Sequence, residues 1–247
     1  MLFLDLPRLR QALLNLPGEE AQYRMAPALR RQQIPDSWTR QGVRESAVFI
    51  LLFPRDEQDV GSGGQGTIFN HTGGGRQGAG SGGQRAQENK PSQAQMLHTV
   101  LMQRPVYEGA HSGQISFPGG RLEPWDTDLQ QTALREMEEE IGVASGSVEV
   151  LGPLSGLYVP VSHSHIQPFV GFVHQEPIFR PDPREVQDLL VTSISALFND
   201  SAKDETEITV GNGIRLNAPY YAVHDRMVWG ATAMIISELE ALVKGLE

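Results

Sequence analysis

The chain carries four closely spaced carboxylates directly after Arg135, namely Glu136, Glu138, Glu139 and Glu140. At about 100° per residue of α-helix, Glu136, Glu139 and Glu140 fall on one arc roughly 100° wide, whereas Glu138 lies well away from them. Like charges at these spacings destabilise a helix by about 0.2–0.5 kcal/mol per pair, and acids in its last turn face the negative end of the dipole. A hard divalent cation reverses this balance, because Mg²⁺ and Mn²⁺ prefer oxygen ligands. The pattern therefore favours a metal site over the alternative, a solvated acidic surface.

The element that must position these acids is a short helix with recognisable ends. Either Asp126 or Thr127 is expected as its N-cap, and Gly142 suits the left-handed position after its last turn. Apolar residues recur every four positions and predict the face that packs inward: Leu129, Ala133, Met137 and Ile141. Two glycines just upstream, Gly119 and Gly120, allow a backbone turn that side chains would obstruct.

These residues resemble the Nudix box, whose pattern is Gly, five residues, Glu, seven residues, Arg-Glu-apolar-x-Glu-Glu-x-Gly-apolar. The second half of the box matches throughout, from Arg135 to Val143. In the first half, Asp126 stands where the box has Glu, and eight residues separate it from Arg135 rather than seven. Similar spacing occurs in the coenzyme A pyrophosphatase branch of the family, so the departure favours that branch.

Segments outside the box also resemble the coenzyme A branch. Its additional motif places an Arg nine residues before a Gly, followed after three more residues by Phe-Pro-Gly-Gly, and Arg104, Gly113 and Phe117 have that spacing. The resemblance implies that these three residues contact the substrate, although a strand-end arginine paired with a surface acid is an equal alternative for Arg104. Three specificity positions of the motif are unmatched: Met102, Pro105 and Gly109. Similarity at residues 150–171 and 228–233 extends the resemblance over most of residues 44–243.

The resemblance implies a role for each residue of the site. The predicted metal ligands are Glu136, Glu139, Glu140 and the carbonyl of Gly119, and the ion would be Mg²⁺ or Mn²⁺. Glu136 would also orient or deprotonate the attacking water, and Arg135 would hold the carboxylates in place as the fourth catalytic residue. Metal ions supply what attack on a pyrophosphate phosphorus requires: neutralised charge, a more acidic water and a stabilised leaving group.

The leading functional hypothesis is hydrolysis of the pyrophosphate of coenzyme A or its thioesters, giving 3′,5′-ADP and 4′-phosphopantetheine or its acyl derivative. One alternative is hydrolysis of another nucleoside diphosphate derivative, such as ADP-ribose or a dinucleotide. The other is a Nudix-like module that binds a nucleotide without turnover. Such relatives typically lose a box carboxylate, whereas all three are present in this chain.

Other polar residues carry weaker signals. Glu185 occupies a place where Nudix enzymes often have a further acidic residue, which makes it a candidate for the site. His111, His163 and His165 are interpreted as polar loop residues, because the chain has no cysteine and no further ligand pattern surrounds them. The zero cysteine count also excludes a disulfide framework and thiol chemistry.

Composition limits the partners. A net charge of −10 without a basic cluster argues against nucleic-acid binding, so the expected partner is a small-molecule nucleotide. No apolar stretch approaches the roughly 20 residues of a membrane span, and Asp5, Arg8 and Arg10 interrupt the apolar start before a signal-peptide core. A soluble cytoplasmic protein is therefore expected, and the sequence carries no signal for an oligomeric state.

The Nudix resemblance implies an α/β fold, an α/β/α sandwich around a mixed sheet. Residues 1–35 are expected to form a helical extension, and residues 36–247 the Nudix domain. Within residues 5–31 we expect an amphipathic helix, followed by a proline-marked connector near Pro17 and an Arg-rich stretch to Arg31. The apolar run at residues 47–53 predicts a strand buried on both faces. Residues 56–95, rich in Gly, Gln and Ser, are interpreted as a disordered insertion between neighbouring strands. Further strands are expected at 148–154, 167–173 and 189–193, and a final helix at about 231–244.

Overall fold

The computed structural model describes residues 6–28, 30, 42–55, 96–106, 112–210 and 213–246. One sheet contains eight strands: β1 (Arg44–Arg55), β2 (Met96–Gln103), β3 (Ile115–Ser116), β4 (Gly119–Arg121), β5 (Glu149–Pro153), β6 (Leu157–Val159), β7 (Ser164–Phe172) and β8 (Asp188–Ser193). A second sheet contains β9 (Lys203–Val210), β10 (Ile214–Val223) and β11 (Arg226–Trp229). The α-helices are α1 (Leu6–Ala12), α2 (Gly18–Tyr23), α4 (Leu129–Ile141), α5 (Ile194–Leu197) and α6 (Gly230–Lys244), with 3₁₀ turns η2 (Ser145–Ser147), η3 (Pro160–Ser162) and η4 (Asp200–Ala202). Among the described helices, none is long and apolar enough to cross a membrane.

The large sheet is mixed, as predicted. Its central order is β3-β2-β1-β7-β5, with β4 added to β1, β6 to β7 and β8 to β2. Strands β1 and β7 run parallel, and the other described pairings of this sheet are antiparallel. The parallel pair extends from Arg44 opposite Ser164 to Leu52 opposite Phe172. The site-bearing strand β4 therefore lies against the first half of the central strand β1.

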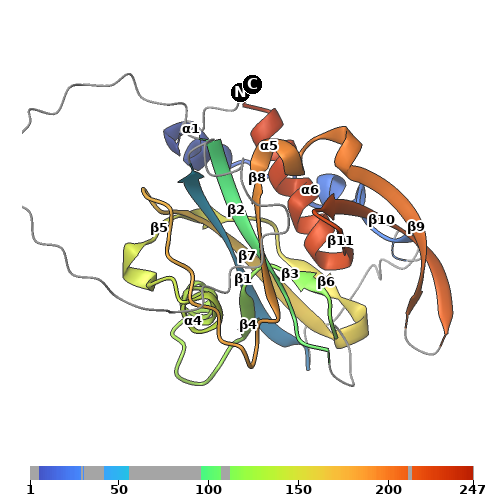
Figure 1. Cartoon of the computed structure of the whole chain (residues 1–247), viewed down its shortest axis with the longest axis horizontal. Coiled ribbons are helices and arrows are strands. Elements are labelled where there is room, and N and C mark those ends of the chain that lie inside the picture. The colour runs from blue at the N-terminus through green and yellow to red at the C-terminus, as the bar shows by residue number, and fades with distance from the viewer. Residues whose placement is uncertain are drawn as a thin grey trace, which may run out of the picture.

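Strand β1 is buried on both faces, which confirms the interpretation of its apolar run. Phe49 and Leu51 belong to different layers from Ile50 and Leu52, because successive side chains of a strand point to opposite faces. One layer packs against the apolar stripe of α4, and the other packs against α6. Figure 1 shows α4 and α6 on opposite sides of β1, so the α/β/α arrangement is present.

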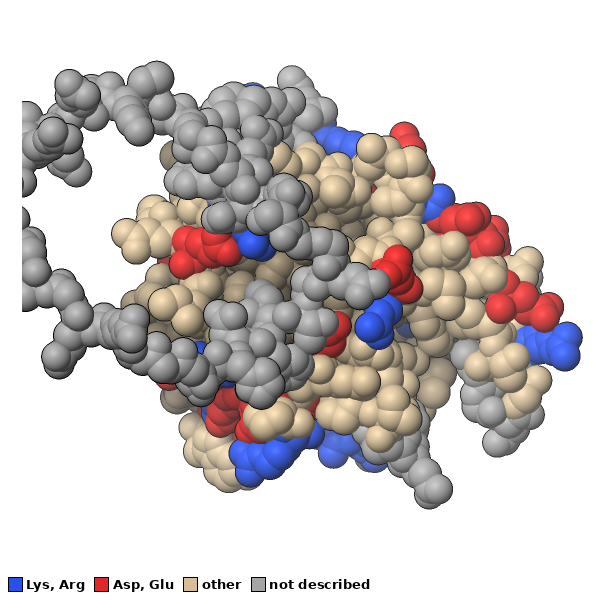
Figure 2. All heavy atoms as spheres, in the orientation of Figure 1, with Lys and Arg blue, Asp and Glu red and all other residues tan. Residues whose placement is uncertain are grey.

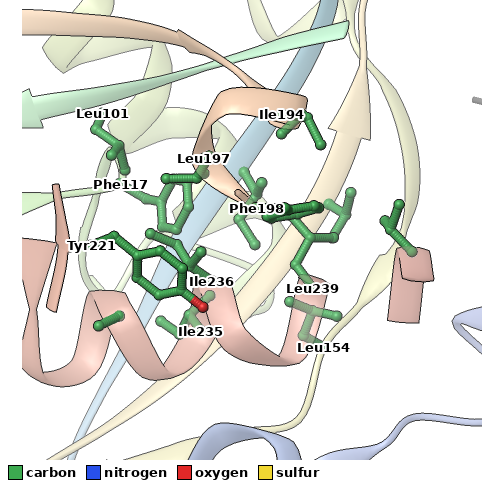
Figure 3. Packing of buried hydrophobic residues seen from close by; sticks show 14 of the residues in the cluster. Leu101, Phe117, Leu154, Ile194, Leu197, Phe198, Tyr221, Ile235, Ile236 and Leu239 are labelled. Carbon is green, nitrogen blue, oxygen red and sulfur yellow. The ribbon is translucent and has the colours of Figure 1, made fainter. Parts of the chain in front are cut away.

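The layer between the large sheet and α6 forms the larger of the two core clusters. Figure 3 shows Tyr221 and Phe117 above α6, close to Ile236, all within one cluster of buried side chains. Leu9 and Met25 belong to the same cluster, so the N-terminal helices pack directly onto it. The predicted connector near Pro17 is present, because α1 ends at Ala12 and Pro17 is the N-cap of α2; this second helix was not predicted. The division into an extension and a Nudix domain remains a prediction.

The predicted insertion at residues 56–95 lies outside the described residues. The strands on either side of it are paired neighbours, with Arg55 opposite Met96 at the end of the β1–β2 ladder. The other predicted elements correspond to β5, β7, β8 and α6 within a few residues at each end.

The second sheet was not predicted from the sequence. Its strands β9, β10 and β11 are antiparallel and adjoin α6. Figure 2 shows acidic side chains gathered over this sheet, and β9 contributes exposed Asp204, Glu205 and Glu207. Such a polar strand carries little of the apolar alternation by which a half-buried strand is recognised.

Candidate active site

Helix α4 begins one or two residues later than the two alternative capping patterns predicted. Its N-cap is Asp128, whose Oδ1 accepts a hydrogen bond from the N–H of Gln131 at 2.8 Å. The predicted N-caps, Asp126 and Thr127, are therefore wrong; Asp126 is engaged by Arg135, and the Thr127 N–H donates to the Gln131 side chain at 2.6 Å. At the other end, Gly142 has φ 72° and its N–H donates to a carbonyl of the last turn, which confirms the predicted left-handed cap.

Arg135 is the hub of the acidic helix. Its Nε and Nη2 donate to the two carboxylate oxygens of Asp126, each at 2.9 Å, and its Nη1 donates to both Glu136 and Glu139, also at 2.9 Å. Nη2 further donates to the carbonyl of Arg121 at the end of β4. The Asp126 side chain is 1% exposed, and the hydrogen bonds from Arg135 hold its pKa well below the ordinary value. One guanidinium thus ties the helix acids to the loop that precedes the helix.

Glu140 is joined to the glycine turn from the other side of the helix. Its Oε2 accepts a hydrogen bond from the N–H of Gly119 at 2.7 Å. The Gly119 carbonyl accepts from Nη2 of Arg104 at 2.9 Å, and the same nitrogen lies 3.9 Å from Glu140 Oε1. Arg104, Gly119 and Glu140 therefore form one contiguous group, and the pairing of Arg104 with an acid involves a buried carboxylate of the site.

The two glycines of the turn permit the close approach of helix and strand. A Cβ on Gly120 would lie 2.3 Å from the carboxyl carbon of Glu136, and one on Gly119 would lie 2.3 Å from the carbonyl oxygen of Ala47. Gly119 also has φ +156°, which side-chain-bearing residues rarely adopt. The Glu136 carboxylate consequently lies directly on the backbone of β4.

Burial raises the pKa of two carboxyl groups of the site. At both Glu136 and Glu140, burial is the largest cause of the raised pKa. The pKa of Glu140 rises to about 8, even though the charge of Arg104 opposes the shift. Glu185, an exposed residue of the segment before β8, raises both pKa values further through its charge. The candidate role of Glu185 thus gains an electrostatic link to the site.

The remaining helix acids differ in exposure. Glu139 is the most open carboxylate of the predicted metal set, with its side chain 55% exposed, and it forms an ion pair with Arg135. Glu138 points elsewhere and accepts a hydrogen bond from the N–H of Ser145 at 3.0 Å. Helical register therefore separated Glu138 from the other three as predicted.

The predicted ligands match a hard divalent cation in chemistry but are not gathered around one point. Among the described residues, no three carboxylate or imidazole side chains lie close enough together to hold an ion as they stand. Guanidinium groups account for this arrangement, since Arg135 holds Glu136 and Glu139 while Arg104 holds the Gly119 carbonyl. The donor set nevertheless fits Mg²⁺ or Mn²⁺, because it consists of oxygens whose buried charge the arginines only partly offset.

Two of the predicted substrate contacts differ in their surroundings. Gly113 lies in a turn with φ +66°, and its N–H donates to the carbonyl of Pro105 at 3.1 Å. Phe117 is 1% exposed and belongs to the core beneath α6, so a direct contact with substrate is not supported. Phe117 lies between β3 and β4 and belongs to the same core layer as Ile115, on the side of the sheet opposite α4.

The described histidines have polar partners, and the interpretation of His165 as a loop residue is wrong, because it lies in β7, whereas His163 directly follows η3. His163 Nδ1 lies 2.6 Å from the hydroxyl of Tyr158, and His165 Nδ1 lies 2.8 Å from Glu45 Oε2. His111 is outside the described residues. Sequence reasoning missed Thr132, whose hydroxyl donates to Asp126 at 2.9 Å; the four-residue spacing from the N-cap Asp128 would have been its signal.

A glycine turn on a mixed sheet, closed by an acidic helix whose arginine binds two of the helix carboxylates, is the arrangement of a Nudix domain. The NUDIX domain family model matches residues 91–209. The chain belongs to the Nudix family.

Individual relatives are similar over slightly more than half of the chain. Human "Mitochondrial coenzyme A diphosphatase NUDT8" is 32% identical over 141 residues, which cover 57% of this chain and 59% of that protein. The "Uncharacterized Nudix hydrolase NudL" of Yersinia pestis is 33% identical over 141 residues, covering 57% of this chain and 69% of that protein.

Solved structures with a related arrangement include a C. elegans Ap4A hydrolase binary complex, with a TM-score of 0.46, 10% identity and coverage of 82% of this chain and 99% of that one. A MutT/nudix family protein from Enterococcus faecalis has a TM-score of 0.47 and 13% identity, with coverage of 98% of this chain and 76% of that one.

Proposed function

We propose that the protein hydrolyses the pyrophosphate bond of coenzyme A or one of its thioesters, giving 3′,5′-ADP and 4′-phosphopantetheine or its acyl derivative. The observation that carries the proposal is the contiguous group of Arg104, Gly119 and Glu140. It joins the arginine of the additional motif to a buried carboxylate of the Nudix box. The human relative is named a coenzyme A diphosphatase, which supports the same substrate class.

In this proposal Glu136, Glu139, Glu140 and the carbonyl of Gly119 hold Mg²⁺ or Mn²⁺. When bound, the ions neutralise phosphate charge, acidify water and stabilise the leaving group. Glu136 lies against β4, and burial raises its pKa above the ordinary value, which makes it a stronger proton acceptor for the attacking water than an exposed carboxylate. Arg135 keeps the carboxylates in register through its bonds to the helix and the preceding loop.

Arg104 is proposed to bind the anionic substrate. Its side chain is 30% exposed, and a guanidinium presents several donors suited to phosphate oxygens. Gly113 contributes through the turn that follows Arg104, whereas Phe117 supports that turn from the core. We propose that the unmatched motif positions, including Met102 and Pro105, change which thioester of coenzyme A the protein prefers.

The direct test is hydrolysis of a substrate panel with Mg²⁺ and with Mn²⁺: coenzyme A, acetyl-CoA, ADP-ribose, NADH and a dinucleoside polyphosphate. Glu136→Gln and Glu140→Gln should each lower turnover by orders of magnitude, because each removes a carboxylate from the proposed metal set. Glu138→Gln is the matched control on the same helix and should retain activity. Full activity in either of the first two variants would contradict the site assignment.

The panel also discriminates the alternatives. Faster turnover of ADP-ribose or a dinucleotide would replace coenzyme A as the substrate while leaving the chemistry intact. Binding of these compounds without products under either metal would favour a nucleotide-binding module. The three carboxylates of the box argue for turnover, since a module that only binds has no need of the complete set.

The expected cytoplasmic location also stays a proposal, because the human relative is named as mitochondrial. Imaging of the tagged protein beside a mitochondrial marker decides between the two compartments.

A further inference from the structure

The turn between β10 and β11 docks onto the end of the large sheet. Within this turn, Nε2 of His224 lies 3.0 Å from the carbonyl oxygen of Val191 in β8. Arg226, the first residue of β11, donates from Nη1 to Oε1 of Gln103 in β2, and its Nη2 lies 3.8 Å from Asp188 in β8. The second sheet therefore contacts the large sheet through an arginine that lies beyond residues 91–209, the part matched by the family model.

Gln103 transmits this contact toward the proposed substrate-binding arginine. Its Nε2 donates to the carbonyl of Gly113 at 3.4 Å. The chain segments on either side are joined by two backbone bonds, from Arg104 N–H to the Gln114 carbonyl at 3.0 Å and from Gly113 N–H to the Pro105 carbonyl at 3.1 Å. We call residues 104–105 and 113–114 the turn base, because these bonds close it.

The chemistry of the three groups fixes the direction of the chain of hydrogen bonds. A guanidinium only donates, so the carbonyl oxygen of the Gln103 amide must face Arg226. The NH₂ end of the same amide is then directed to the Gly113 carbonyl, which only accepts. Without Arg226, nothing in this chain of hydrogen bonds fixes which end of the Gln103 amide faces which way. The NH₂ group is then no longer held toward the Gly113 carbonyl, and that hydrogen bond weakens.

The two faces of β2 separate this support from the chemistry. Leu101 and Met102 belong to different core layers, so Gln103 points to the α6 side and Arg104 to the α4 side, where it reaches Glu140. The contact from Arg226 thus acts on the backbone around Arg104 from behind the sheet. It touches neither the carboxylates nor the proposed metal ligands.

We propose that Arg226 is a positioning residue that sets substrate affinity by orienting the Gln103 amide and thereby holding the turn base that carries Arg104. The proposal rests on the proposed function for its kinetic readout. Its second readout, hydrogen exchange at the turn base, does not depend on any activity.

The experiment compares Arg226→Ala, Arg226→Lys and Gln103→Glu with the unmodified protein. Arg226→Ala should raise KM by about tenfold, which is the effect expected from the loss of one charge-assisted hydrogen bond. The kcat of this variant should stay within about twofold of the kcat of the unmodified protein. Without substrate, the amides of Arg104 and Gly113 should exchange faster in the same variant. Arg226→Lys keeps a donor to Gln103 and should restore part of both effects.

Gln103→Glu separates positioning from simple anchoring. A glutamate keeps the contact with Arg226 but cannot donate to the Gly113 carbonyl, so it should raise KM and accelerate exchange as Arg226→Ala does. The matched control is Arg215→Ala, which removes an exposed ion pair with Glu207 on the same sheet and should change neither readout. Unchanged KM and exchange in Arg226→Ala, a neutral Gln103→Glu, or an equal effect of Arg215→Ala would each overturn the proposal. If coenzyme A is not a substrate, the exchange measurements still decide it.

Discussion

Replacing Asp126 with asparagine tests the reasoning about the Arg135 hub. Asp126 accepts two bonds from Arg135 at 2.9 Å, one from Thr132 Oγ1 at 2.9 Å and one from the Glu123 N–H at 3.0 Å. Asparagine offers one acceptor oxygen and turns an NH₂ group toward a donor or the guanidinium. Because the side chain is 1% exposed, water cannot substitute for the lost bonds.

The expected cost is about 3 kcal/mol in the free energy of unfolding, which combines lost charge-assisted bonds with a partly unpaired guanidinium. Glu136 and Glu139 still contact Arg135, so the cost should not reach that of an isolated buried charge. The assay is urea unfolding at pH 7 followed by circular dichroism. Asp182→Asn is the control, because Asp182 pairs with Arg184 at the surface, where Arg184 is 85% exposed, and no measurable change is expected.

The pH dependence gives a second check. The pKa of Asp126 is lowered in the folded protein, so its stabilisation is present above its ordinary value of 3.8 and is lost as pH falls toward the folded value. The difference between wild type and Asp126→Asn should therefore be constant from about pH 5 to 8 and shrink below about pH 4. An Asp126→Asn variant as stable as Asp182→Asn at pH 7 would refute this account of the hub.

Four further outcomes follow from the same geometry. Gly120→Ala should displace the Glu136 carboxylate, since the new Cβ would lie 2.3 Å from its carboxyl carbon, and kcat should fall at least about tenfold while the protein remains folded by circular dichroism. Burial raises the pKa of Glu140 from 4.5 to about 8, so urea unfolding of the metal-free protein should show stability falling across that pH range, and Glu140→Gln should remove this contribution. Arg104→Gln removes a positive charge 3.9 Å from Glu140 and should tighten Mn²⁺ binding several-fold in the substrate-free protein, as measured by electron paramagnetic resonance. Replacing residues 58–94 with a short linker should leave kcat and KM nearly unchanged, because the flanking strands are already paired neighbours.

The parts of the fold that could be predicted are those whose signal is local and periodic. The four-residue spacing from Leu129 to Ile141 predicted both the inward face of α4 and the separation of Glu138 from the other acids. The unbroken apolar run of β1 predicted burial on both faces, because neither face needs polar residues. Both signals depend on register along a single element, which the sequence specifies directly.

What could not be predicted depends on contacts between distant segments. The N-cap moved to Asp128 because Asp126 is captured by Arg135, a tertiary contact that outweighs the local capping pattern. Phe117 belongs to a motif associated with substrate, but which face of the sheet it occupies was not evident from the motif. The contact between Gln103 and Arg226 joins residues 123 positions apart, and the sequence near neither residue predicts it.

The two departures from the Nudix box act as one compensated change. Helical side chains lean toward the N-terminus, so Arg135 extends back over the first turn of α4 and can reach a residue before the N-cap. Aspartate is one methylene shorter than the usual glutamate, and the extra residue in the connection places its backbone where the shorter side chain meets both guanidinium nitrogens at 2.9 Å. Either change alone would alter the distance between carboxylate and guanidinium, whereas together they preserve the two-point contact. In this chain the two-point contact between Arg135 and Asp126 therefore depends on the length of the acidic side chain and on the length of the connection together.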